Sequence, residues 1–324
     1  MTSSSTALTP SPEVCVRRQR WFALVVAMLA AAAPFAVYPV FLMKGLCFAL
    51  FASSFNLLLG FAGLLSFGHA MFFGWSSYVT AHALKVWGAT PELAILAGTA
   101  VAAGMGLVTG WLAIRRQGIY FAMITLALAQ FFFFLAVQVP FTRGEDGIQA
   151  VPRGHLFGLI DLSKMMPMYW FVLAVFGLGL FLLHRIVHSP FGQVLRAIRD
   201  NEPRAVSLGY RVERYKLIAF VLSAAVAGLA GSLKSIVFQL ASLTDVDWHT
   251  SGEVVLMTLL GGVGTLFGPT VGAFVVVTIQ NYFAGAGSWV TITQGGIFVV
   301  CVLGFREGLV GMASPFMKRR GIIV

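Results

Sequence analysis

Nine apolar segments follow one another along this chain, and they limit its fold more than any other feature. They cover residues 21–42, 45–60, 69–87, 92–114, 118–139, 168–187, 216–240, 251–283 and 288–305. A helix needs about 20 residues to cross the hydrocarbon core of a bilayer, and most of these segments are about that long. None alternates polar and apolar residues as a lipid-facing barrel strand does. The pattern predicts an all-α polytopic membrane protein with about eight to ten transmembrane helices.

The composition excludes a water-soluble enzyme. Only 10% of the 324 residues are charged and 58% are hydrophobic, whereas a soluble domain has about 25% charged residues. The chain has no phosphate-binding G-x-x-x-x-G-K-[ST] loop, no HExxH and no GxSxG motif, so it has no recognisable ATPase site of its own. Its three cysteines, Cys15, Cys47 and Cys301, are far apart, which indicates neither a disulfide framework nor a metal site.

The first apolar run is predicted to be a span and not a cleaved signal. Arg17, Arg18 and Arg20 precede an apolar run from Trp21 to Met43, which is longer than the core of about 7–15 residues in a secretory signal. We therefore expect a cytoplasmic N-terminal tail over 1–20, a transmembrane domain over 21–306 with a cytoplasmic loop at 188–215, and a cytoplasmic C-terminal tail over 307–324.

The basic residues predict the orientation, because cytoplasmic loops are enriched in Lys and Arg. With the N-terminus inside, 16 of the 22 Lys and Arg residues fall on the cytoplasmic side, and seven of them lie between Arg185 and Lys216. Both termini are then cytoplasmic. The net charge of +10 is read as this topological signal and not as a nucleic-acid surface.

Glycines interrupt the segment at 251–283, which we interpret as a broken or re-entrant pair of helices. Non-helical backbone at membrane depth requires burial in protein or contact with a wet cavity. The residues at 60–68 have a similar spacing of glycines. Two such interrupted segments in the two halves of a transporter point to a shared central site, and tight helix packing is the alternative explanation. Separately, Ser223, Ala227 and Gly231 repeat every four residues, as on a helix-packing face.

The cytoplasmic stretch at 189–209 predicts two short helices. Ser189 is a good N-cap before Pro190, Pro203 can open a second helix, and Gly209 can close it. Helices this short are not stable alone in water, so the pair is predicted to dock in a groove on a partner protein. Binding of its basic residues to anionic lipid headgroups is the alternative.

Several stretches together resemble permeases of ABC importers for branched-chain amino acids, most closely the LivM-type subunit. They are the 189–209 loop, 56–70, 120–127, 142–147, 215–224 and 261–269. The resemblance implies the ABC importer permease fold, no catalytic activity of the chain itself, and residence in the bacterial cytoplasmic (inner) membrane. It also implies the partners: a sister permease subunit, two cytoplasmic ATP-binding subunits that bind the ATP, and a periplasmic solute-binding protein.

The resemblance also implies the residues that couple the chain to the ATPases. They are Arg196, Arg199, Glu202, Ala205 and Gly209. The general ABC-permease loop has Glu-Ala-Ala followed by Gly at a fixed offset. Here Pro203 and Arg204 follow Glu202, and Gly209 is one place late, so the resemblance assigns coupling to the loop as a whole.

Polar residues in apolar surroundings are the candidates for the translocation path, because they should face protein or water. They are Asn56, Ser66, His69, Gln130 and Glu253. For each, a packing hydrogen bond between helices is the alternative. Ionisable groups within spans are few, which disfavours a proton- or sodium-coupled carrier. A branched-chain amino acid is the expected substrate; urea, short amides or aromatic acids, and a stand-alone carrier or channel, remain alternatives.

Overall fold

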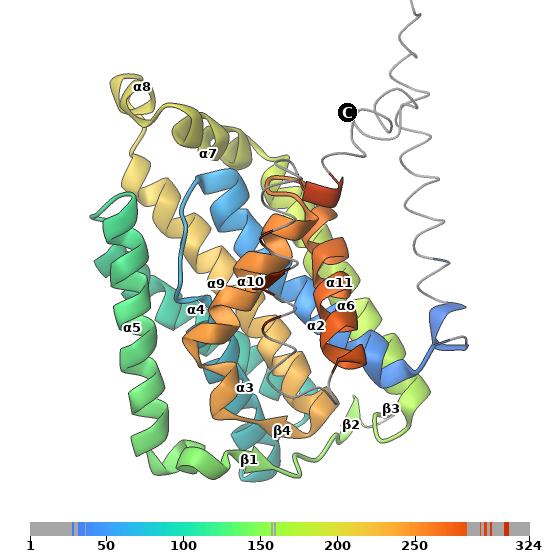
Figure 1. Ribbon diagram of the computed structural model, residues 1–324. Coiled ribbons are helices and arrows are strands. Elements are labelled where there is room, and N and C mark those ends of the chain that lie inside the picture. Colours follow the sequence, from blue (N-terminus) through green and yellow to red (C-terminus); the bar gives the residue numbers. More distant parts are fainter. Residues whose placement is uncertain are drawn as a thin grey trace, which may run out of the picture.

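The protein folds into a bundle of helices in the computed structural model (Figure 1). The structure describes residues 37–156, 158 and 160–283, together with 28, 32–35, 292, 295–296, 299 and 308–310. The predicted N-terminal tail, most of the first apolar segment, most of the segment at 288–305 and nearly all of the C-terminal tail lie outside these residues. The description below concerns the part of the chain from α2 to α11.

Five helices of the described chain are long and apolar enough to cross a membrane. They are α2 (Pro39–Asn56) with the π-helical turn η1 (Leu57–Phe61), α4 (Pro91–Ala113), α5 (Ile119–Gln138), α6 (Met165–Val187) and α9 (Val212–Phe238). The shorter helices are α3 (His69–Lys85), α7 (Pro190–Asp200), α8 (Glu202–Ser207), α10 (Trp248–Gly261) and α11 (Gly268–Tyr282). The prediction of an all-α polytopic protein is confirmed for the described residues, and the break within 251–283 lies between α10 and α11.

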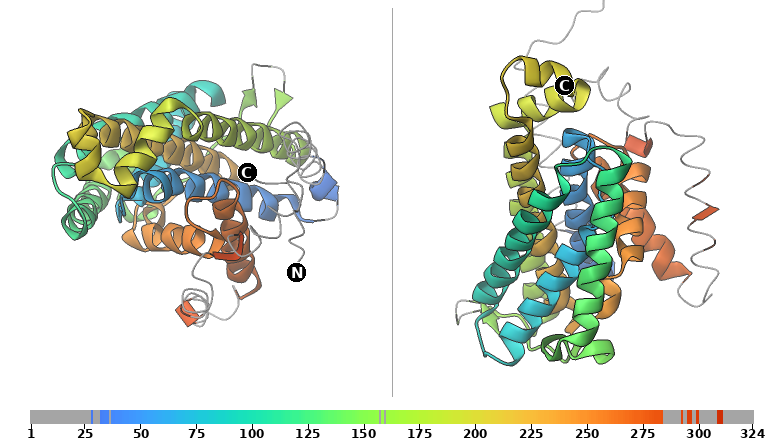
Figure 2. Two further views of the ribbon diagram at one scale, coloured as in Figure 1. Left: turned by 90° about the horizontal axis from the view of Figure 1, so that it is seen from above. Right: turned by 90° about the vertical axis from the view of Figure 1, so that its left-hand side faces the viewer.

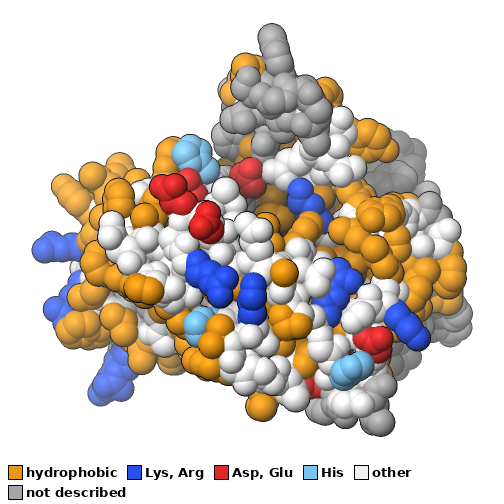
Figure 3. All heavy atoms as spheres, turned by 90° about the horizontal axis from the view of Figure 1, so that it is seen from below, with side chains coloured by type: hydrophobic (Ala, Val, Ile, Leu, Met, Phe, Trp, Pro, Cys, Tyr) orange, Lys and Arg blue, Asp and Glu red, His pale blue; other side chains and the backbone are white. Residues whose placement is uncertain are grey.

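The two ends of the bundle differ in their secondary structure. One end carries α7 and α8, which lie across the ends of the long helices (Figure 2); we call it the α7–α8 end. The other, the β end, carries the short strands β1 (Ile148–Gln149), β2 (His155–Leu156), β3 (Ile160–Asp161) and β4 (Leu240–Ala241). There β1 pairs antiparallel with β4, and β2 with β3. Acidic, basic and histidine side chains lie among hydrophobic ones on this end (Figure 3). The 3-10 turns Pro140–Thr142, Gly144–Asp146 and Leu243–Asp245 complete the described elements.

Helices α2, α3 and α9 form the core, while α5 and α6 lie at the periphery. We compared the most apolar stretch of 18 residues in each helix. Of these residues, 78% are buried in α2 with η1 and 67% in α9, but only 28% in α5 and in α6. The outer helices expose large side chains such as Phe131, Phe134 and Phe181. An apolar surface of this kind is suited to contact with lipid chains.

The predicted small-residue face of α9 is confirmed. Ser223, Ala227 and Gly231 are all buried, and α9 packs against α3 and α4. A methyl group on Gly231 would overlap the carbonyl oxygen of Phe73 on α3. Small residues let the two backbones approach this closely. In a bilayer the lipid chains are as apolar as the side chains, so helices associate through such close packing and not through the hydrophobic effect.

One predicted break is wrong. The sequence indicated a boundary at Lys44–Gly45 between the first two spans, but α2 runs without interruption from Pro39 through both residues. Pro39 occupies the first helical position, where its missing N–H is harmless. Gly45 instead leaves room for the ring of Phe274 on α11, which a methyl group at that position would overlap.

A long helix followed by an irregular return and a shorter helix occurs twice in the described chain. After α2 and η1, residues 62–68 return into the bundle and α3 begins there; after α9, residues 239–247 do the same before α10 (Figure 1). The two copies run in opposite directions. The starts of the two shorter helices meet, because Ser251 Oγ of α10 accepts the backbone N–H of Ala70 in α3 at 2.9 Å.

Candidate functional site

Helices α7 and α8 form a small platform whose ends are set by local residues, as predicted. Ser189 Oγ accepts the N–H of Gly192 at 3.3 Å and caps α7. Asn201 Oδ1 accepts the N–H of Arg204 at 3.0 Å and caps α8, which begins one residue before Pro203. Gly209 has φ of +87°, a left-handed conformation that favours glycine, and it ends α8. The platform therefore follows from capping chemistry readable in the sequence.

Apolar contacts hold the platform onto the start of α9. Ile198 of α7, Ala205 of α8 and Val212 of α9 are buried together. The ring of Phe191 stacks on that of Tyr215, with centroids 5.6 Å apart. Short helices need such a dock to be stable, and α9 supplies part of it within the same chain.

Two arginines of α7 contact the π-helical turn that ends α2. Arg199 donates through Nη1 to the carbonyl oxygen of Gly60, and its other guanidinium nitrogens contact the Asp200 carboxylate at 3.0 and 3.1 Å. The Arg196 guanidinium lies over the ring of Phe61, 5.2 Å from its centroid. A π-helical turn leaves the regular hydrogen-bond ladder and is often found at functional sites. These contacts link the platform to a non-standard piece of a spanning helix.

Glu202 forms the second link between the platform and the bundle. Its Oε1 accepts from Lys216 Nζ of α9 at 2.7 Å and from Gln117 Nε2, in the turn between α4 and α5, at 2.9 Å. Lys216 is almost fully buried, while the Glu202 side chain is 26% exposed. The carboxylate therefore ties α8 to two other parts of the chain at the same end.

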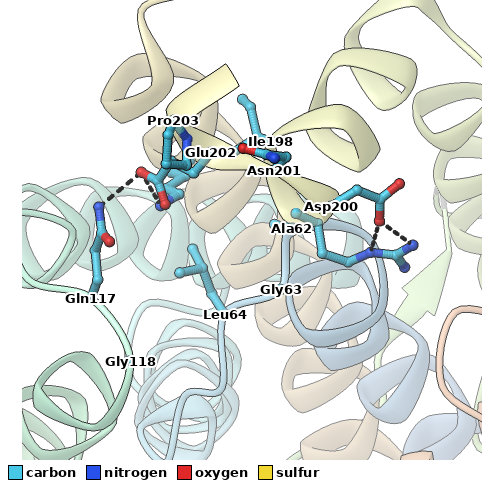
Figure 4. A pocket seen from close by; sticks show the side chains of 12 residues that line it. Ala62, Gly63, Leu64, Gln117, Gly118, Ile198, Asp200, Asn201, Glu202 and Pro203 are labelled. Carbon is cyan, nitrogen blue, oxygen red and sulfur yellow. Dashed lines mark hydrogen bonds and ion pairs between the residues drawn. The ribbon is translucent and has the colours of Figure 1, made fainter. Parts of the chain in front are cut away.

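A pocket of about 440 Å³ lies between the platform and the bundle (Figure 4). It is lined by Ala62, Gly63, Leu64, Gln117, Gly118, Lys216 and the run from Ile198 to Pro203. Gln117 and Glu202 point toward one another at one side, and Asp200 stands at the other (Figure 4). On the side of this pocket, the platform therefore contacts the bundle through a few polar groups beside an open space, in addition to its apolar contacts with α9.

The two glycine-interrupted segments meet beneath this platform. Asn56 Nδ2 donates to the Thr265 carbonyl oxygen at 2.8 Å, and its Oδ1 accepts the Gly264 N–H at 2.9 Å. A methyl group on Gly60 would lie only 2.6 Å from the Gly264 nitrogen. We call residues 56–63 and 261–268 the glycine junction. The sequence placed both segments at a shared central site, and the structure brings them together at the α7–α8 end.

Asn56→Leu is expected to loosen the glycine junction. The substitution leaves the half-buried Gly264 N–H and Thr265 carbonyl without their partner, and each loss costs about 1 kcal/mol or more. Thermal unfolding of the purified protein in detergent measures the effect. Asn281→Leu, the same change at an exposed position of α11, is the control and should change stability by less than about 0.5 kcal/mol. Equal melting temperatures for the two variants would contradict the role given to Asn56.

Ser66 and His69 lie in and just after the return at 62–68 and are fully buried. Ser66 Oγ accepts the N–H of Gly68 at 3.2 Å. His69 Nε2 lies 2.7 Å from Ser223 Oγ, which donates to the Ser54 carbonyl oxygen. Because the Ser223 hydroxyl donates its proton to Ser54, it accepts in its bond with the histidine, and His69 Nε2 is the donor. Ser66 therefore binds within the return itself, whereas His69 joins the start of α3 to α9 and, through Ser223, to α2.

Gln130 and Glu253 lie apart from the other path candidates, Asn56, Ser66 and His69. Gln130 is half-buried on α5, at the periphery of the bundle. Glu253 is half-buried on α10, and its Oε1 accepts from Gln280 Nε2 of α11 at 3.0 Å. The structure therefore brings Asn56 and Arg199 to one junction and Ser66 and His69 to one return, and leaves Gln130 and Glu253 elsewhere.

Sequence reasoning missed a buried ion pair near the β end. Lys234 Nζ of α9 lies 2.6 Å from Asp245 Oδ2, and the two side chains are only 9% and 8% exposed. Asp245 also accepts from the N–H and hydroxyl of Ser242, both at 3.3 Å. A lysine inside an apolar span requires an acidic partner, and that requirement was the signal that could have led to Asp245.

Known proteins similar to the chain are transport permeases. A family model described as "Branched-chain amino acid transport system / permease component" matches residues 39–303. The high-affinity branched-chain amino acid transport system permease protein LivM of Escherichia coli (strain K12) is 26% identical, over 96% of this chain and 79% of the relative. The probable branched-chain amino acid transport permease protein LivH of Methanocaldococcus jannaschii is 26% identical over 70% of this chain and 75% of its own. The ribose import permease protein RbsC of Bacillus subtilis is 26% identical over 66% and 68%. No solved structure has significant similarity to the chain.

Proposed function

Because the chain belongs to the family of branched-chain amino acid transport system permease components, as a LivM-type member, we propose that it imports aliphatic amino acids. It would form the translocation path together with a sister permease subunit, driven by two separate ATP-binding subunits and supplied by a periplasmic solute-binding protein. The apolar helices and the family make it a multi-pass protein of the inner membrane.

The α7–α8 end is proposed to face the cytoplasm. It carries Arg196, Arg199, Arg204 and the other basic residues of the stretch from Arg185 to Lys216, and such residues are enriched on that side. Both termini would then be cytoplasmic as well. The β end would receive substrate from the binding protein.

The observation that carries the coupling proposal is the bond from Arg199 to the Gly60 carbonyl. Movement of an ATPase that holds α7 and α8 would act on the π-helical turn of α2, and through Asn56 on the second glycine segment. Glu202 would act on α9 and on the α4–α5 turn through Lys216 and Gln117. Ala205 and Gly209 would keep the shape of α8, the first by burial and the second by its left-handed conformation.

For the translocation path, Gln130 and Glu253 are the stronger candidates, because both are half-buried polar side chains of spanning or broken helices. The hydrogen bonds of Asn56, Ser66 and His69 lie within the bundle. We propose that Asn56 shapes the path by holding the glycine junction, and Ser66 and His69 by holding the return at 62–68. Mostly apolar walls with a few polar groups suit an amino acid with an aliphatic side chain.

ATP-driven uptake of labelled leucine into vesicles containing the complete complex tests this function. We expect leucine to accumulate only when the binding protein, the ATP-binding subunits and ATP are all present. Urea, benzoate and ribose serve as competitors that represent other substrate classes. Accumulation of one of these compounds instead of leucine would show that the substrate belongs to that class and is not an aliphatic amino acid. Leucine uptake without the ATP-binding subunits would indicate a stand-alone carrier or channel.

A further inference from the structure

Lys44 and Glu253 are two opposite charges in an apolar setting that do not contact one another. Lys44 lies in the second turn of α2 and Glu253 in the second turn of α10, and both are half-buried. Helices α2 and α10 pack against one another, so the two opposite charges are near enough to attract. Within the described residues, however, they form no ion pair, and the Lys44 ammonium has no hydrogen-bond partner.

The neighbouring pair Lys234–Asp245 shows what a purely structural ion pair looks like in this chain. Its atoms are 2.6 Å apart, and both side chains are almost fully buried. Helix α9, which carries Lys234, also packs against α2, which carries Lys44. Lys234 and Asp245 thus form a direct ion pair, whereas Lys44 and Glu253 form none among the described residues.

Helix α11 contacts both helices that carry Lys44 and Glu253. It packs between α10 and α2, and Gln280 Nε2 donates to Glu253 Oε1 at 3.0 Å. The ring of Phe274 lies over Gly45, the residue after Lys44. Helix α2 begins at the β end, where Figure 3 shows acidic and basic side chains around a hollow. Within the described part of the chain, a carboxylate held by Gln280 and an ammonium without a hydrogen-bond partner therefore lie on two helices that both pack against α11.

We propose that Lys44 and Glu253 form a binding site for the zwitterionic head of an amino acid, an inference that rests on the proposed function. The Lys44 ammonium binds the substrate carboxylate. Glu253 Oε2, which has no hydrogen-bond partner among the described residues, binds the substrate ammonium. Charges at membrane depth are expensive unless paired, and a zwitterion pairs both without adding net charge.

The test is leucine uptake by the complete complex carrying Lys44→Met or Glu253→Gln. Met keeps the length of the side chain without its charge, and Gln keeps the oxygen that accepts from Gln280. Each variant should lower uptake at saturating binding protein about tenfold or more, as expected for loss of one charge-assisted hydrogen bond. Lys85→Met and Glu213→Gln, the same changes at exposed positions, should stay within about twofold of wild type.

Thermal unfolding of the same complexes separates binding from a structural role. Lys44→Met and Glu253→Gln should melt close to wild type, because no direct bond between them is lost. Uptake within about twofold of wild type in both variants, or a fall in melting temperature as large as that of Lys234→Met, would overturn the site and leave the proposed function intact. A wild-type complex that hydrolyses ATP and accumulates no leucine would overturn both.

Discussion

Lys234→Met is expected to destabilise the protein more than any other single substitution considered above. Asp245 would remain buried with only Ser242 as a partner. Removing one member of a buried ion pair costs about 3–5 kcal/mol, because the remaining charge is left uncompensated. The segment at 242–247 would lose its tie to α9, and with it the position of the start of α10. Thermal unfolding of the purified protein in detergent measures the loss.

The double variant Lys234→Met with Asp245→Asn isolates the cause. With neither charge present, most of the lost stability should return, because replacing a whole buried pair is often close to neutral. Lys85→Met removes an exposed lysine that donates to the Gln149 carbonyl oxygen, and it should change stability by less than about 0.5 kcal/mol. A double variant no more stable than Lys234→Met would show that the charge pair is not the reason.

Arg199→Glu is expected to abolish most ATP-driven uptake. The new carboxylate cannot donate to the Gly60 carbonyl and would lie beside Asp200, so α7 would be separated from the π-helical turn. Loss of a charged hydrogen bond together with a like-charge contact should lower uptake about tenfold or more. Uptake of labelled leucine by the reconstituted complex is the measurement. Hydrolysis of ATP should continue without matching transport.

Two further variants make the Arg199 experiment specific. Arg116→Glu places the same charge reversal on an exposed residue of the α4–α5 turn at the same end, and it should leave uptake within about twofold of wild type. Arg196→Glu combined with Arg199→Glu removes both arginine contacts to η1. If this double variant assembles and transports as well as wild type, the platform does not couple ATP hydrolysis to transport.

Much of the fold could be predicted because its signals are local. The breaks between α4 and α5 and between α10 and α11 follow from Arg115 with Arg116 and from clustered glycines, and the platform follows from Ser189, Pro203 and Gly209. The cap of α8 by Asn201 came only from the structure. The break expected at Lys44–Gly45 was wrong for an equally clear reason. A lysine beside a glycine is typical of a loop in a membrane protein. Here the glycine lies within α2 and leaves room for the ring of Phe274, from a helix more than 200 residues later in the chain.

The candidate site could be predicted only in part. The sequence singled out Arg199 and Asn56, but it assigned them to different roles, coupling and path. The structure joins both to the glycine junction through bonds to Gly60 and to Gly264 and Thr265. These partners are 139 to 209 residues away in the chain, and no local pattern reveals such a pairing.

The sequence by itself determined that this chain is a helical membrane protein, where its described helices mostly begin and end, and which family it resembles. Those properties depend on hydrophobicity, caps and charge counts, all of which act within a few residues. Only the tertiary structure decided which polar groups bind one another: His69 binds Ser223, and Lys234 binds Asp245. In an apolar bundle many hydrophobic pairings are nearly equivalent, so the position of each polar partner depends on how the helices pack.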